Sequence, residues 1–597
     1  MSNEVNRTSL PEWVATATLL ASVIVLAGWS NAAQRIMMVA DDGGGGGASP
    51  PISETVTQAA AENPTQPLPV IVTYKQPPTI LQIDELSALG ADVLALLDGS
   101  NALTAVMAAG DAAALADNES VATVGIDAPM VAMLDVGRRT IGQTHLPRPL
   151  NGLTGAGITI ALLDSGIANH PDLAGRILAS VDIVGQLNRA DESNEVLNTG
   201  SEVFRTSGTL SAPQRQEAAQ STDSGLGSDG AGDPFGHGTH IAGILASGGQ
   251  SSRGAYRGVA PGASLVDVRV LDANGGGTVS GVIAGIDWII ANKNVYGIRV
   301  LSMSLGHAPL ELTDKDPLVL AVERAWEAGI VVFCSAGNFG TYGNWTVTSP
   351  GNSPRVITVG SLTDWNSSRT TDDMVSSYSS RGPALGGALK PDFVAPGNRI
   401  VSTRAAGSQL DTSYPEWRVT HGNTPEAGYF ELSGTSMATP VAAASAALML
   451  EADPSLTPDN VKARMMLGAD PELTGHPYDH GAGSLDLEAA LEDRSRVAYA
   501  PSPMLVRNTD VVGEISLEDV ASLWQYPPLY DSTIWGDSTL WSDSTLWSDS
   551  TIWGDSTIWG DSTIWGDSTI WGDSTIWGDS TIWGDSTIWG DNTPMPD

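Results

Sequence analysis

The chain has 597 residues, enough for one large domain with smaller accessory units. Its formal net charge of −39, from 68 acidic and 29 basic residues, argues against nucleic acid as a partner, because a polyanion would be repelled. A single cysteine, Cys334, excludes a disulfide framework within the chain, and its apolar neighbours predict a buried thiol on a strand.

The first 40 residues contain an apolar run at 13–29, followed by small residues near Ala32 and Ala33. This pattern is typical of a secretory signal, and the run is also just long enough to span a bilayer. We therefore expect a secreted or otherwise extracytoplasmic protein, with residues 1–40 either cleaved or kept as an anchor. Contact with a membrane is expected only through this segment, if it stays uncleaved.

Residues 41–67 are rich in Gly and Pro and are predicted to form a flexible linker. Strands are predicted beyond it at 68–75, 102–108 and 121–127, with a short helical stretch after the second of them. This order of elements predicts a small α+β unit over 68–135.

A different pattern begins at about residue 136, where helical segments such as 280–294 alternate with unbroken apolar strands. Such strands with crossover helices indicate a parallel sheet covered on both faces. We assign 136–495 to this α/β domain, with a polar, aperiodic insertion at 189–233 and a linker at 496–530. The apolar strands are predicted at 157–164, 264–271, 298–305, 329–337 and 355–362.

The C-terminal segment 531–590 repeats a hexapeptide ten times, mostly as DSTIWG. Thr, Ile and Trp favour strands, and Gly-Asp favours a turn. One interpretation is a β-solenoid with three hexapeptides in each turn. The other is a disordered tail whose aspartates discourage aggregation. Surface attachment, sugar binding and export signalling all remain open as its role.

Three short motifs in the α/β domain carry reactive groups. Asp164 ends a predicted strand in ALLDSG, His237 begins an apolar helix in FGHGTHIAG, and Ser436 begins another in GTSMATP. Strand carboxyl ends and helix amino ends gather at one edge of such sheets. A carboxylate that holds an imidazole, which in turn takes a hydroxyl proton, makes serine a nucleophile.

The position of Ser436 at a helix start suits acyl transfer, because free N–H groups and the positive end of the helix face the developing oxyanion. Pro440 is predicted to fall in the first turn, where it would remove no hydrogen bond. Asn338, in SAGNFG, ends another apolar strand, and its side-chain amide is a candidate second donor to the oxyanion.

The motifs DSG, HGTH, AGN and GTSMATP, in this order, resemble those of the subtilisin-like serine peptidases, or subtilases, over about residues 140–495. The resemblance implies a three-layer fold with a parallel seven-stranded sheet, and a serine endopeptidase that works through an acyl-enzyme. It implies Asp164, His237 and Ser436 as the triad and Asn338 as the oxyanion donor.

Two further segments resemble the edges between which this family pairs an extended substrate. The resemblance assigns substrate binding to Gly275, Gly276, Gly277, Ser304, Leu305 and Gly306. Residues 68–135 resemble the inhibitor-type propeptide of subtilases, which implies a zymogen cut between about Ala128 and Thr140. The expected partners are therefore protein or peptide substrates and the chain's own propeptide as an intramolecular inhibitor.

The chain also departs from the family pattern. Segment 246–258, which follows the HGTH helix, contains no carboxylate, and this argues against the calcium loop that many subtilases carry there. No cofactor is predicted, and structural calcium stays open without an assigned site. A zinc site at His237 and His240 lacks a third ligand at motif spacing, so His240 is predicted to be a packed histidine. The alternative function is an inactive peptidase fold that carries a repeat-based surface-binding or adhesion tail.

Overall fold

The computed structural model describes residues 52–133, 152–185, 232–365, 372–421 and 428–507, apart from 472 and 474–475, together with strands at 197–198, 515–517 and between 533 and 589. The predicted signal at 1–40 lies outside these residues, as does most of the insertion at 189–233. Among the described helices, none is both long and apolar enough to cross a membrane.

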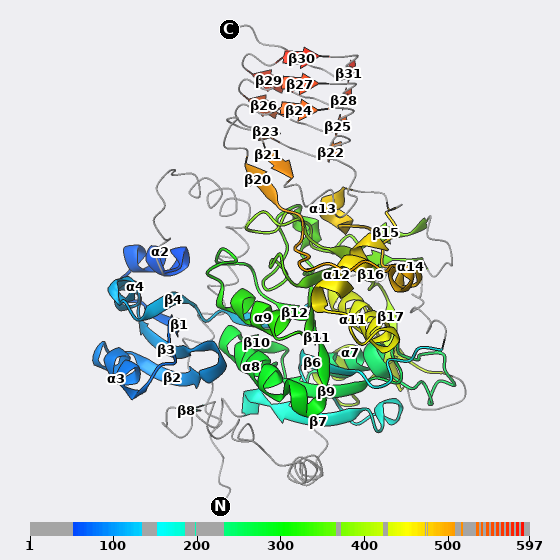
Figure 1. The fold of residues 1–597 in the computed structure, drawn as a ribbon, viewed down its shortest axis with the longest axis horizontal. Coiled ribbons are helices and arrows are strands. Elements are labelled where there is room, and N and C mark those ends of the chain that lie inside the picture. The colour runs from blue at the N-terminus through cyan, green and yellow to red at the C-terminus, as the bar shows by residue number, and fades with distance from the viewer. Residues whose placement is uncertain are drawn as a thin grey trace, which may run out of the picture.

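The N-terminal unit is a small sheet packed against short helices (Figure 1). Its strand order is β4-β1-β3-β2-β8, antiparallel except for β8, which pairs in parallel with β2. The strands expected at 68–75, 102–108 and 121–127 are present, whereas β2 was not predicted. The elements are α2 (Glu54–Glu62), β1 (Pro67–Tyr74), α3 (Ile80–Ala88), β2 (Asp92–Leu97), β3 (Ala102–Ala108), α4 (Ala109–Ala114), β4 (Val121–Ile126) and β8 (Leu197–Asn198).

The predicted linker at 41–67 is wrong from Ile52 onward. Ile52 forms a bridge with Val124, and the Ser53 hydroxyl accepts a hydrogen bond from the Val56 amide and so caps α2. Val56 is fully buried in the core of the unit. This short helix was not predicted because only one of its residues, Val56, is buried, so its sequence shows little apolar periodicity.

The main domain is built on one central sheet with the order β15-β14-β13-β11-β6-β9-β7, to which β16 adds by pairing with β14. Seven of the strands are parallel, as expected, and the short β15 is antiparallel to β14. Strands β7 and β16 were not predicted. The bounds are β6 (Thr159–Asp164), β7 (Ile177–Asp182), β9 (Ser264–Arg269), β11 (Ile298–Met303), β13 (Val331–Ser335), β14 (Ile357–Thr363), β15 (Met374–Val375) and β16 (Phe393–Pro396).

Helices cover both faces of this sheet, which gives the three-layer α/β architecture expected. Figure 1 shows α8 (Val279–Tyr296) and α9 (Pro317–Glu327) on one side, and α7 (His237–Ala246) and α11 (Thr435–Ala452) on the other. The remaining elements of the domain are β10 (Gly276–Thr278), β12 (Leu305–Gly306), β17 (Ile400–Thr403), α10 (Gln409–Ser413), β18 (Arg418–Val419), β19 (Tyr429–Leu432), α12 (Pro458–Leu467), α13 (Pro477–His480) and α14 (Leu487–Glu492).

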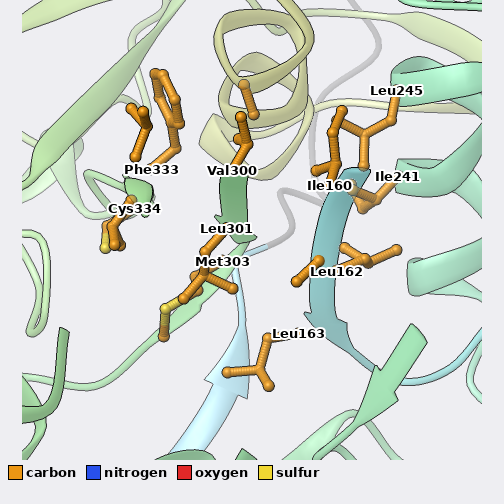
Figure 2. Packing of buried hydrophobic residues seen from close by; sticks show 14 of the residues in the cluster. Ile160, Leu162, Leu163, Ile241, Leu245, Val300, Leu301, Met303, Phe333 and Cys334 are labelled. Carbon is orange, nitrogen blue, oxygen red and sulfur yellow. The ribbon is translucent and has the colours of Figure 1, made fainter. Parts of the chain in front are cut away.

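The core between the layers is fully buried and apolar, which fixes the strand and helix ends that carry the site. In Figure 2, Ile160 and Leu162 of β6 lie beside Ile241 and Leu245 of α7. Cys334 of β13 is also buried, and burial raises the pKa of its thiol to about 12. The prediction of a buried strand thiol is confirmed.

The predicted linker at 496–530 is wrong in its first part, because that part packs on the domain. Asp392 is buried between Lys390 (Nζ to Oδ2, 2.7 Å) and Lys462 (Nζ to Oδ1, 3.4 Å), and the Ser502 hydroxyl donates to it at 2.5 Å. Met504 forms a bridge with Ala388. Strands β20 (Leu505–Arg507) and β21 (Ile515–Leu517) then form an antiparallel pair.

In the hexapeptide segment, each strand pairs in parallel with the strand 18 residues further on, as Thr533 with Thr551. This pairing forms three separate parallel sheets. It is the register of a solenoid with three hexapeptides per turn, the first of the two interpretations. The strands are β22 (Thr533–Trp535), β23 (Thr539–Leu540), β24 (Thr545–Trp547), β25 (Thr551–Trp553), β26 (Thr557–Trp559), β27 (Thr563–Trp565), β28 (Thr569–Trp571), β29 (Thr575–Trp577), β30 (Thr581–Trp583) and β31 (Thr587–Trp589).

Candidate active site

Asp164 and His237 form a buried hydrogen-bonded pair. Asp164 is the last residue of β6, and His237 is the first residue of α7. The His237 Nδ1 lies 2.8 Å from one carboxylate oxygen of Asp164 and 3.0 Å from the other. Because an ionised carboxylate only accepts, the proton of the neutral ring stays on Nδ1 and the Nε2 lone pair is available as a base.

Asp233 holds the start of α7 in place. Its carboxylate accepts from the backbone N–H of Gly236 (2.7 Å) and Thr239 (2.8 Å) and from the Ser165 hydroxyl (2.8 Å). Asp233 is buried, and desolvation raises its pKa although these donors oppose the shift. Ser165 follows Asp164 directly, and Gly236 precedes His237 directly. The Asp233 carboxylate is therefore hydrogen-bonded to both of the segments that carry the Asp164–His237 pair.

The role of Asp233 was missed because the residue was included in the polar insertion at 189–233. The available signal was an acidic residue just before the predicted helix. A carboxylate there can accept hydrogen bonds from the free N–H groups of the first turn and so stabilise the helix start. Gly236, between Asp233 and His237, has a φ of 104°, and a Cβ there would lie 2.3 Å from the Ser408 hydroxyl oxygen. The tight entry into α7 therefore requires glycine.

Ser436 lies in the first turn of α11, at the same edge of the sheet, whereas Pro440 lies inside the helix, so its predicted place in the first turn was wrong. Met303, the last residue of β11, pairs with Leu163, so Ser304 stands beside Asp164 on the neighbouring strand. The Ser436 hydroxyl donates to the Ser304 carbonyl at 3.0 Å, and the Ser304 hydroxyl donates to the Ser436 carbonyl at 2.8 Å. Helices α7 and α11 also pack against each other.

The hydroxyl of Ser436 is therefore turned onto Ser304 and not onto His237. His237 Nε2 is buried and has no hydrogen-bond partner among the described residues. The expected series runs from Asp164 to His237 to Ser436. Only the contact between His237 and Ser436 is missing, because the Ser436 hydroxyl is rotated towards Ser304. Such bonds often form only when substrate is bound.

Asn338 is held so that its amide nitrogen is free. Its Oδ1 accepts from both the backbone N–H and the hydroxyl of Thr435, each at 2.9 Å. Its buried Nδ2 has no partner within the part of the chain that the structure describes. Thr435 precedes Ser436, so a free donor is fixed next to the serine; sequence reasoning did not identify Thr435 as the residue that fixes it.

The predicted substrate edges lie on either side of a strand of the chain itself. β5 (Pro129–Ala132) pairs antiparallel with β10 on one side and with β12 on the other. The Ala132 N–H donates to the Gly275 carbonyl at 3.2 Å, and the Met133 N–H donates to the Ser304 carbonyl at 3.1 Å. All six residues predicted to bind substrate border this strand: Gly275, Gly276, Gly277, Ser304, Leu305 and Gly306.

The N-terminal unit contacts the α/β domain at further points. Asp127 is partly buried and accepts from the backbone N–H and the hydroxyl of Ser280, at the start of α8, at 2.9 Å and 2.6 Å. The Ser100 hydroxyl donates to Asp287 at 2.7 Å. The Thr55 hydroxyl donates to the Leu310 carbonyl at 3.1 Å, beside the buried Glu311. The unit and the domain are thus joined by hydrogen bonds at several separate points.

His240 is a packed histidine, as predicted. Its Nε2 lies 3.1 Å and 3.0 Å from the carbonyls of Ile400 and Phe430, and burial lowers its pKa to about 3. The described residues contain no group of three or more side chains of the kinds that hold a metal ion. In segment 246–258, the Ser251 N–H donates to Asp172 at 2.7 Å.

Comparison with known proteins identifies relatives. The family model described as "Subtilase family" matches residues 155–488. The chain is 38% identical over 379 residues to the serine protease AprX of Bacillus subtilis, covering 63% of this chain and 75% of AprX. It is 32% identical over 343 residues to subtilisin E of the same species, covering 57% of this chain and 67% of subtilisin E.

The fold is similar to that of fervidolysin from Fervidobacterium pennivorans, which is described as a keratinolytic enzyme related to subtilisin. The match has a TM-score of 0.51 at 21% identity, and it covers 72% of this chain and 61% of fervidolysin. The chain thus spans less than two thirds of that structure, and the likeness concerns the fold.

Proposed function

Because this chain belongs to the subtilase family of serine endopeptidases, we propose that it cuts peptide bonds in proteins with Asp164, His237 and Ser436 as its catalytic residues. The observation that carries the assignment is the buried Asp164–His237 pair, which leaves Nε2 as a base at the same sheet edge as Ser436. A rotation of the Ser436 hydroxyl from Ser304 towards Nε2 completes the series.

In the first step, Ser436 Oγ attacks the substrate carbonyl carbon while His237 Nε2 takes the hydroxyl proton. The carbonyl oxygen becomes an oxyanion that accepts from Asn338 Nδ2 and the Ser436 backbone N–H. His237 then gives its proton to the departing amine, which leaves an acyl-enzyme. Water, deprotonated by His237, attacks the ester and releases the acid and Ser436. Asp164 holds the ring and stabilises its cationic form throughout.

The N-terminal unit is proposed to be an inhibitory propeptide, removed by the enzyme itself. Support comes from β5, which occupies both edges of the cleft that an extended substrate would use. Export rests on the apolar run at 13–29, which fits a signal or an anchor.

The test is hydrolysis of casein by the full chain, with labelling by a serine-directed phosphonate. We expect the label on Ser436, and we expect Ser436→Ala to lose both activities and to accumulate uncut precursor. Ser445→Ala is the matched control, because Ser445 is a buried serine of the same helix that donates to the Val441 carbonyl. Absence of labelling after removal of residues 1–135 would favour the inactive carrier, and normal maturation of the Ser436→Ala chain would exclude self-cleavage.

The folded precursor is expected to become less stable as the pH rises. Burial raises the pKa of Glu311 from 4.5 to about 7, against hydrogen bonds from Ser53 and Thr55 that lower it. A carboxyl whose pKa is raised in the folded chain binds its proton more tightly there than in the unfolded chain. The Glu311 contribution to stability is therefore fully present below about pH 4.5, is lost as the pH rises to about 7 and does not change above that. The shift corresponds to about 3 kcal/mol.

The measurement is thermal unfolding of the Ser436→Ala precursor between pH 5 and pH 8, with and without Glu311→Gln. The neutral amide removes this titration, so the fall in melting temperature over that interval should become smaller. Glu327→Gln is the control, because the Glu327 side chain is 60% exposed. An equal fall with and without Glu311→Gln would contradict the assignment of the pH dependence to Glu311.

A further inference from the structure

Resting on the function above, we propose that Asp267 is a positioning residue for the catalytic pair of Asp164 and His237. Its carboxyl holds the turn that follows Asp164, and its negative charge, once formed, makes His237 a stronger base. Asp267 lies in strand β9, between β6 and β7, and belongs to none of the motifs from which the site was predicted.

Asp267 lies on the face of the sheet that α7 covers. A Cβ placed on Gly285 of α8 would lie 3.3 Å from the side chain of Val268, so Val268 faces α8. Successive side chains of a strand point to opposite faces, which puts Asp267 on the side of α7. Asp267 also pairs with Leu162, which lies beside α7 in Figure 2. Since Asp164 follows Leu162 by two residues, Asp267 and Asp164 share one face on adjacent strands.

One oxygen of Asp267 accepts two hydrogen bonds. Its Oδ2 accepts from the backbone N–H of Ile167 at 3.2 Å and from the Ser180 hydroxyl at 2.5 Å. Ile167 lies three residues after Asp164, so the first bond holds the turn that leads away from the catalytic carboxylate. Ser180 belongs to β7, so the second bond ties that turn to the neighbouring strand.

The other oxygen of Asp267 is buried without a donor. The residue is 1% exposed, and its Oδ1 has no hydrogen-bond partner among the described residues. Such surroundings favour the protonated acid over the carboxylate. Burial raises the pKa of Asp267 to about 7; Asp233 and Asp164 add to the rise, and the bonds from Ser180 and Ile167 oppose it. Asp267 therefore gains its charge in the range where histidines titrate.

Several charged or titratable side chains stand on the elements around Asp267. They are His237 and His240 of α7, Asp233 just before α7, Asp164 of β6, Asp182 of β7 and Arg269 of β9 itself. His240 stays neutral, because burial lowers its pKa to about 3. Asp182 and Arg269 form an ion pair at 3.5 Å. Helix α8 covers the opposite face, where its Asp287 accepts from Ser100 of the N-terminal unit.

His237 is the neighbour that becomes a cation when it takes the serine proton. A negative charge on Asp267 stabilises that cation, so His237 binds the proton more tightly and is a stronger base. The coupling is mutual, because a protonated His237 in turn favours the ionised form of Asp267. Asp267 should therefore move the rise of activity with pH to a higher pH and increase the rate reached there.

The first measurement is kcat/KM on a chromogenic peptide between pH 5 and pH 10, after the precursor has been cut by an added peptidase. Asp267→Asn keeps an oxygen that can accept from Ile167 and Ser180, but it cannot ionise. The acid limb of the profile should move about 0.5 unit lower, and kcat at high pH should fall about 3-fold.

Two further variants separate this effect from a structural one. Ser180→Ala removes a donor that favours the charged form of Asp267, so the acid limb should move in the same direction by a smaller amount. Ser180 is exposed, and its replacement tests the proposal even if Asp267→Asn fails to fold. Asp182→Asn is the matched control: its side chain is 42% exposed, solvent screens its charge, and the limb should stay in place.

The second measurement does not depend on turnover. In the Ser436→Ala precursor with isotope-labelled histidine, nuclear magnetic resonance follows protonation of the His237 ring, and Asp267→Asn should lower its midpoint by a similar amount. An acid limb that stays in place in Asp267→Asn, or moves equally in Asp182→Asn, in an enzyme that still hydrolyses casein would overturn this inference alone. Casein hydrolysis that survives Ser436→Ala would instead overturn the proposed function.

Discussion

Replacing His237 with alanine is expected to lower kcat by about 10⁶-fold, the size of loss measured when the serine or histidine of such a unit is removed. His237 is the group through which Asp164 acts, since its Nδ1 lies 2.8 Å from that carboxylate and its Nε2 is the free base. Without the imidazole, the Ser436 hydroxyl keeps its proton and donates only a hydrogen bond to the Ser304 carbonyl, so Ser436 is a poor nucleophile.

The sharper result concerns the double variant. The kcat of the double variant, His237→Ala with Ser436→Ala, should be no lower than that of either single variant, because the two groups act in one step. Initial rates on a chromogenic peptide measure the effect, with His421→Ala as a histidine control at the contact with Tyr256. For these measurements the precursor must first be cut by an added peptidase. Losses that multiply in the double variant would show that the two residues act separately.

Replacing Asn338 with leucine is expected to lower kcat by about 10²–10³-fold with little change in KM. The Asn338 amide is free and buried, and its partner would be the oxyanion of the transition state, so its loss affects the chemical step more than binding. Leucine has a similar volume and keeps the site filled. The check is to measure kcat and KM separately on the same peptide, for the unchanged enzyme and for Asn338→Leu.

Thr435→Val provides the matched comparison for Asn338. It removes the hydroxyl that donates to Asn338 Oδ1 but keeps the backbone N–H that donates to the same oxygen. We expect a smaller loss than for Asn338→Leu, since one of the two bonds that orient the amide remains. A fall in kcat/KM through KM alone for Asn338→Leu would assign Asn338 to substrate binding.

The parts of the fold that could be predicted are those with a local signature. Strand β11 is an unbroken apolar run, and its bounds, Ile298–Met303, fall within the predicted 298–305. Strand β16, Phe393–Pro396, was missed because it is four residues long and has a proline at its end, so it depends on pairing with β14. Its existence is decided by tertiary contact and not by its own pattern.

The same distinction holds in the candidate site. Asp164, His237 and Ser436 each stand in a recognisable motif, and the structure brings them to one sheet edge. Asp233 and Thr435 could not be identified in the same way, because what they do depends on which distant atom they reach. The hydroxyl orientation of Ser436 also lay beyond sequence reasoning, since it depends on the position of the Ser304 carbonyl.

The 18-residue pairing of the hexapeptides sets how this end of the molecule can change in length. Neighbouring strands of one sheet lie about 4.8 Å apart, so gaining or losing three units lengthens or shortens the stack by about one such layer and leaves its final face unaltered. A single unit instead turns the terminus by a third of a revolution. Unequal recombination between near-identical repeats would therefore produce variants that differ in reach by small, regular increments.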